Sequence, residues 1–163
     1  YHEQLKINDE WAIRTPNGFK WWADKNAQTI EVIGEEIGPN GEIGALISIR
    51  TDFLCNLELT DHSLAAMNAL LMVFAAMSGP VYDAEKRTLE LCSLVRVHPG
   101  VSTWMNSLLS VAAVMQIAEA RIMANEVARV LGAQEAVSGH PEHGIRQDPD
   151  QMVGVVFLCP QSH

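Results

Sequence analysis

The sequence contains few cysteines and few basic residues, and both shortages exclude classes of protein. Its three cysteines, Cys55, Cys92 and Cys159, are widely spaced and form no CxxC pair. A disulfide framework is therefore not predicted, and a reducing, cytoplasmic location is favoured. The 11 lysines and arginines are outnumbered by 20 acidic residues, which gives a net charge of -9. Because phosphate groups repel such a chain, nucleic acids and anionic membranes are poor candidate partners.

Recognisable catalytic and phosphate-binding motifs are also missing. No serine lies in a GxSxG pattern. The glycines between residues 34 and 44 belong to a strand-turn-strand unit and not to the strand-helix junction that binds phosphates. The apolar stretches are interrupted by Asn68, Gln116 and Glu119, so neither a signal peptide nor a membrane span is predicted. We therefore predict a protein that is not an enzyme, with no catalytic residues and no cofactor.

The sequence does contain a long stretch that reads as a single helix, residues 102–131, which holds no glycine or proline and is followed by Gly132. Glycine is common directly after a helix because it enters the left-handed region without strain. We predict one helix about 45 Å long, which exceeds the length needed to cover a single sheet. Its first part, 108–117, is apolar on most sides and is expected to be core. Its second part, from Glu119, is amphipathic and is expected to bind a partner or the protein's own apolar tail.

Alternating apolar and polar residues predict an antiparallel sheet. We expect a hairpin over 11–21, a strand over 28–37 with a bulge at Ile33-Gly34, a strand over 43–54, and a second hairpin over 81–98. Trp11, Ile13, Phe19 and Trp21 are expected to share a face of the first hairpin. A very apolar helix is predicted between the two hairpins, over 61–78.

The predicted order is thus β-β-β-β-α-β-β-α. Because the links between strands are too short for helical crossovers, this order indicates an α+β fold in which two main helices pack on an antiparallel sheet. We assign residues 1–132 to a single domain. Residues 133–163 are predicted to form an irregular arm, which ends in an apolar docking segment over 152–159.

This order of elements across residues 19–131, on a small acidic chain, resembles the type III secretion chaperone-like fold, which includes the YbjN-like proteins. The resemblance implies a dimeric protein that holds an extended or partly folded polypeptide without catalysis. It also implies that residues 64–77 of the apolar helix form the dimer surface. The candidate dimer residues on that helix are Leu64, Met67, Leu71 and Phe74.

Two features suggest where a polypeptide partner would bind. Trp21 and Trp22 point to opposite faces of a strand, so at least one is a candidate exposed anchor, although both also suit a core. The second half of the long helix carries a narrow apolar stripe. The candidate partner-binding residues are Trp21, Trp22, Ile122, Met123, Val127 and Val130.

A small-ligand pocket or an enzyme site is the alternative hypothesis. If the strands over 43–54 and 88–98 are neighbours, Asp52 could orient His98 as a general base beside Arg96. Ion pairing across a solvated sheet face, with Arg50, is the simpler interpretation.

A metal site is suggested by one short segment of the sequence. His140, Glu142 and His143 are residue types that bind zinc. Their segment is flanked by proline and glycine, which provide neither a rigid frame nor a further ligand. We therefore predict a solvated loop and no metal site.

Overall fold

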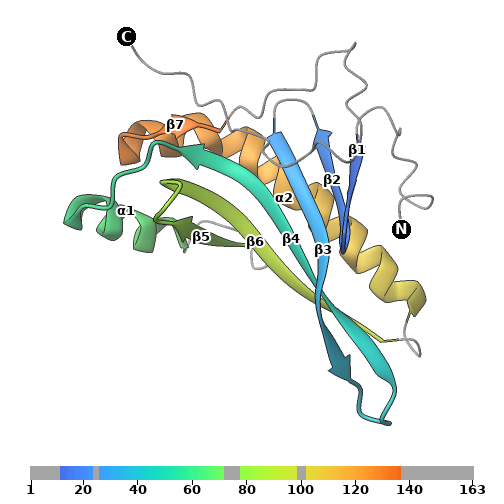
Figure 1. Ribbon diagram of the computed structural model, residues 1–163. Helices are drawn as coiled ribbons and strands as arrows, with labels where there is room; N and C mark the ends of the chain where they lie inside the picture. The colour runs from blue at the N-terminus through green and yellow to red at the C-terminus, as the bar shows by residue number, and fades with distance from the viewer. Residues whose placement is uncertain (1–11, 24–25, 72–77, 99–101, 137–163) are drawn as a thin grey trace.

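The computed structural model describes residues 12–23, 26–71, 78–98 and 102–136, which form one antiparallel sheet and two helices (Figure 1). The sheet order is β1-β2-β3-β4-β6-β5, and β7 pairs with β4. This confirms the predicted α+β fold and the predicted order of its main elements. The strands are β1 (Ala12–Thr15), β2 (Gly18–Ala23), β3 (Asn26–Ile37), β4 (Ile43–Cys55), β5 (Gly79–Asp83), β6 (Thr88–Val97) and β7 (Gln134–Glu135), and the helices are α1 (Asp61–Leu71) and α2 (Ser102–Leu131).

The β1-β2 hairpin forms as predicted, but its register corrects one expected face. Ile13 pairs with Lys20, and successive residues of a strand point to opposite faces of a sheet. Ile13 therefore lies on the face opposite to Phe19 and Trp21, because a shift of one residue in the pairing moves a side chain to the other face. Trp11 lies outside the described residues.

The two central strands, β3 and β4, are longer than the neighbouring strands β2 and β6. The register between them shifts between Val32 and Gly34, where the sequence predicted a bulge. Gly41 has a φ of 79°, which glycine adopts without strain, and it closes the connecting turn. Beyond the bulge the two strands project from the body of the domain as a hairpin arm, residues 34–44 (Figure 1).

Helix α1 begins where the sequence supplies an N-cap. The backbone N–H of Ser63 donates to Thr60 Oγ1 at 3.1 Å, and the backbone N–H of Thr60 donates to Ser63 Oγ at 2.7 Å. This reciprocal pair satisfies two backbone donors at the helix start. The structure describes the helix to Leu71, and residues 72–77 of the predicted helix lie outside the described residues.

Helix α2 has the predicted bounds, and it crosses one face of the sheet (Figure 1). Gly132 follows with a φ of 66°, and the backbone N–H of Ala133 donates to the carbonyl of Ala128 at 2.9 Å. The chain then forms β7, which pairs with Leu54 and Cys55 at the end of β4. The sequence predicted an irregular arm from residue 133. Its first residues instead extend the sheet, and residues 137–163 lie outside the described part.

Two apolar clusters lie between the sheet and α2. The hairpin-side core contains Phe19, Ile30, Ile47, Ile49, Val95, Leu109, Ala112 and Ala113. The α1-side core contains Phe53, Leu54, Leu57, Leu89, Leu91, Ala120, Ala124, Val127, Ala128 and Leu131, and Ala66 and Met67 of α1 pack against it. Most helix residues in both clusters are small, so α2 lies close to the sheet.

Candidate functional site

A buried polar network separates the two cores. Gln28 of β3, Thr51 of β4 and Gln116 of α2 are all fully buried. The Thr51 hydroxyl donates to Gln116 Oε1 at 2.7 Å, and Gln28 Nε2 donates to Thr51 Oγ1 at 2.9 Å. Gln116 lies along the helix between Ala113 of the hairpin-side core and Ala120 of the α1-side core. The network therefore joins the helix to two strands at the middle of their contact.

The same network reaches two more strands. Trp21 Nε1 in β2 donates to Gln28 Oε1 at 2.9 Å, and Gln116 Nε2 donates to Ser93 Oγ in β6 at 3.0 Å. Gln28 Nε2 also donates to the carbonyl of Ala113 at 2.9 Å. Buried polar groups of this kind fix one arrangement, because any rotation or shift of α2 would leave them without partners. The network holds α2 in place and contains no ionised group.

Sequence reasoning did not find this network, although signals for it existed. Thr51 occupies an inward position between Ile49 and Phe53, and Gln116 interrupts an apolar helical stretch. We interpreted Gln116 as a break in a possible membrane span. A polar residue on each of two buried faces indicates a pair that satisfies its hydrogen bonds internally.

The outer face of α2 is apolar and exposed. Val111, Val114 and Met115 are 51%, 57% and 46% exposed, and Ile122 is 80% exposed. With Ala118 they form what we call the α2 stripe, since residues three, four and seven apart lie on one face of a helix. The sequence predicted that 108–117 would be core. That prediction was wrong for the outward residues, because the described chain covers only the sheet side of this half of α2.

The predicted partner-binding residues divide between core and surface. Trp22 and Val127 are 3% and 2% exposed, and Met123 packs against the α1-side core. Trp22 and Val127 are therefore unavailable to a partner in this fold, whereas Met123 is only partly buried. Ile122 and Val130 are exposed. Val127 points inward because it lies three residues after the buried Ala124, on the same face of the helix.

The predicted dimer residues on α1 are only partly accessible. Leu64 is exposed, whereas Met67 packs against the α1-side core. The side chain of Leu71 is not described, and Phe74 lies outside the described residues. Among the described side chains of α1, Leu64 is therefore the large apolar group that a second molecule could contact.

The hairpin arm carries a further exposed apolar surface. Ile37 pairs with Ile43 across the two strands, and they are 80% and 65% exposed. Val32 and Ile33, at the bulge, are also exposed. Because the arm projects beyond the body of the domain, the described part of the chain does not cover these side chains (Figure 1). Alternation along 43–54 puts Ile43 on the same face as Ile47 and Ile49 of the core, but alternation does not show that a strand extends beyond its core.

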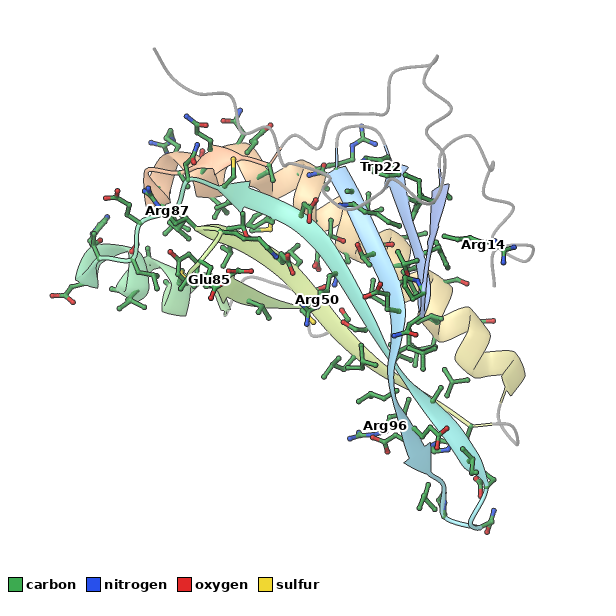
Figure 2. All side chains as sticks on the ribbon, in the orientation of Figure 1. Arg14, Trp22, Arg50, Glu85, Arg87 and Arg96 are labelled. Carbon is green, nitrogen blue, oxygen red and sulfur yellow. The ribbon has the colours of Figure 1, made fainter. Side chains whose placement is uncertain are left out.

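The sheet face opposite α2 carries paired charges. In Figure 2 Arg50 lies on the face of the sheet turned towards the viewer, with α2 behind. Arg50 lies 3.6 Å from Glu90, and Lys20 lies 3.7 Å from Asp52. Each pair joins two different strands, as expected from the interpretation of these charges as ion pairs across the sheet. This surface is a partly buried sheet face with ion pairing across strands.

The residues of the alternative catalytic hypothesis do not converge. Asp52 pairs with Glu90 in the β4-β6 register, whereas Arg96 pairs with Leu46, six residues earlier on β4. At about 3.3 Å per residue this separates Asp52 from Arg96 by roughly 20 Å along the strand. His98 lies two residues beyond Arg96 along the chain, and therefore still further from Asp52. The β4-β6 pairing therefore brings Arg96 and His98 towards the hairpin arm and leaves Asp52 near β5.

Among the described residues, Glu90 is a carboxyl group whose environment opposes its charge. Burial raises the pKa of Glu90, the neighbouring Asp52 carboxylate raises it further, and Arg50 opposes both effects. A raised pKa in the folded state means that Glu90 favours folding below its ordinary pKa of 4.5 and that this contribution is lost as the pH rises through the folded value.

We expect Glu90→Gln to stabilise the protein at pH 7, where the wild-type carboxylate is charged in a partly buried position. The gain should vanish below the ordinary pKa of 4.5, where both side chains are neutral. Urea unfolding from pH 4 to pH 8 measures it. Glu85→Gln, at an exposed position in the β5-β6 turn, serves as the matched control and should change little. Equal effects of Glu90→Gln at pH 4 and pH 7 would contradict the assignment.

The remaining candidate groups form no site in the described residues. Cys55 is buried and Cys92 is half-buried, and neither forms a disulfide. Within residues 12–23, 26–71, 78–98 and 102–136, no three metal-binding side chains gather. His140, Glu142 and His143 lie outside these ranges.

Helix α2 is also long and apolar enough, by length and composition, to span a membrane over Ser107–Leu131. A helix packed on a sheet in a protein core passes the same test. The buried residues of α2 belong to both cores, and its polar Gln116 is bonded to the sheet. These contacts favour a core helix. Comparison of the chain with protein-family models, curated proteins and solved structures finds no match.

Proposed function

We propose that this chain is a non-enzymatic, chaperone-like protein that binds polypeptides and acts as a dimer in the cytoplasm. The hairpin arm is the observation that supports this most directly. Its paired Ile37 and Ile43 are highly exposed, at a point where the domain has no core to receive them. Clustered exposed apolar side chains of this kind mark interaction sites. A partner segment on the arm would bury them.

The charge of the arm indicates the chemistry of its partner. Glu31, Glu35, Glu36 and Glu42 lie on or beside the arm, and Arg96 pairs with Glu36 at 3.0 Å. The acidic excess matches the net charge of -9 of the whole chain. A segment that alternates apolar and basic residues would complement both the isoleucines and the glutamates. The proposed partner is therefore a basic, apolar stretch of polypeptide in an extended conformation.

Fluorescence anisotropy with labelled synthetic peptides tests this proposal. A peptide of alternating leucine and lysine is expected to bind, and a peptide of alternating leucine and glutamate is not. The double variant Ile37→Ser, Ile43→Ser should weaken binding of the basic peptide by about tenfold or more, since it removes two exposed apolar contacts.

Val81→Ser is the matched control, because Val81 is an exposed strand residue on β5, away from the arm. It should bind the basic peptide as the wild type does. Equal affinity of the Ile37→Ser, Ile43→Ser variant and the wild type for that peptide would overturn the assignment of the arm. Equal binding of the acidic and basic peptides would overturn the charge argument.

A further inference from the structure

We infer that the α2 stripe is the surface through which two copies of this chain associate, with their α2 helices antiparallel and crossing at Ala118. This inference rests on the proposed function, because it assigns the dimer surface that the proposal requires. It leaves the hairpin arm free for the polypeptide. It also places the dimer on α2 instead of α1, where the sequence predicted it.

The stripe matches a second copy of itself. Val114 and Ile122 each lie four residues from Ala118, on opposite sides of it, and both are exposed. A two-fold axis at Ala118 would therefore place Val114 of each copy against Ile122 of the other. Interfaces of this type use the same patch twice. A small residue at the crossing point also allows two helix axes to approach to about 8 Å, the closer end of the usual range.

The distribution of charged residues along α2 favours this surface and an antiparallel pair of helices. Each copy carries a net charge of -9, but α2 has no charged residue from 102 to 118. Its charged residues, among them Glu126 and Arg129, all lie in the second half. An antiparallel pair places each charged half beside an uncharged half. A parallel pair would instead bring the two Glu126 carboxylates together, which is unfavourable.

The other exposed apolar surfaces suit a second copy less well. The hairpin arm is acidic, so two arms would repel each other, whereas a basic segment would not. On α1, Leu64 is the exposed large apolar side chain among those described. A single side chain provides little of the area that a stable dimer buries, which is roughly 800 Å² per copy. The α2 stripe offers four large exposed side chains in one line.

Light scattering on the protein as it elutes from a size-exclusion column tests whether the α2 stripe is the dimer surface. The wild type is expected to have twice the chain mass of 17.9 kDa at micromolar concentration. The double variant Val114→Lys, Ile122→Lys should have the mass of one chain, because it places two lysines from each copy in the apolar contact. Val130→Lys is the matched control on the same helix. Val130 is exposed but lies off the stripe, so this variant should remain a dimer.

Disulfide cross-linking tests the direction of the two helices. Under mild oxidation, Ala118→Cys should form a covalent dimer, since a disulfide requires Cα atoms within about 7 Å. Val111→Cys and Asn125→Cys lie seven residues either side and should not cross-link alone. A mixture of those two variants should cross-link, because an antiparallel pair places position 111 of one copy beside position 125 of the other. The wild type, with its native cysteines, sets the background.

The outcomes separate this inference from the proposed function. A wild type of 17.9 kDa would overturn the dimer while leaving peptide binding by the arm to be measured on the monomer. A dimer that survives Val114→Lys, Ile122→Lys but is lost in Leu64→Lys would place the contact on α1. Cross-linking of Val111→Cys alone and of Asn125→Cys alone would show parallel helices. A loss of peptide binding in the arm variant without loss of the dimer would support both assignments.

Discussion

Gln116→Ala is expected to destabilise the folded protein by about 3 kcal/mol, because truncation removes several buried hydrogen bonds and leaves a cavity. Thr51 donates to Gln116 at 2.7 Å, and without Gln116 its hydroxyl loses that acceptor in a place that water does not reach. Ser93 loses the amide donor that lies 3.0 Å away. Since small domains are stable by only about 5–15 kcal/mol, the loss is a large fraction of the total.

Urea unfolding followed by circular dichroism measures this loss. Val130→Ala is the matched control, since it truncates an exposed side chain of the same helix that lies off the α2 stripe, and it should change stability by less than about 0.5 kcal/mol. Gln28→Ala and the double variant Gln28→Ala, Gln116→Ala complete a cycle that reports the coupling between the two amides. Additive losses from the two single changes would show that Gln28 and Gln116 do not act as one network.

Phe53→Ala is expected to cost about 4 kcal/mol, within the range found when a fully buried aromatic ring is truncated. Phe53 is 0% exposed, and it lies in the α1-side core with Leu91 of β6 and Val127 of α2. The ring contacts a sheet and a helix at once, so neither side can easily move to fill the space. The variant should unfold at a clearly lower urea concentration.

Ile37→Ala is the control for Phe53→Ala, because it also shortens a large strand residue but at a position that is 80% exposed. Its effect on stability should be below about 0.5 kcal/mol. A loss of more than 1 kcal/mol at Ile37 would mean that the arm is covered in solution. A loss of less than 1 kcal/mol at Phe53 would contradict its position in the α1-side core.

Local sequence signals predicted most of the elements and several of their ends. The α2 bounds followed from an uninterrupted helical stretch before Gly132, and the bulge in β3 followed from Ile33-Gly34. These features depend on neighbours along the chain. Capping, glycine conformations and two-residue alternation all act over a few residues, so the sequence alone reveals them.

Which apolar face of an element is covered depends on the tertiary structure. Val111 and Val127 are similar side chains on the same helix, yet Val111 is half exposed and Val127 is buried. Helical periodicity shows that they point in different directions, but it does not show where the sheet lies. Alternation likewise does not reveal the exposure of Ile43. Its position in the strand pattern is that of an inward residue, but it lies on the hairpin arm, beyond the end of the core.

The sequence by itself determined the fold class, the order of the main elements and the acidic character that makes nucleic acid a poor candidate partner. The tertiary structure decided which surfaces remain for a partner. Pairing of β3, β4 and β6 under α2 buried Val127 and left the hairpin arm and the α2 stripe exposed. Burial depends on contacts between residues far apart in the chain, such as Gln28 with Gln116. No local pattern contains that information.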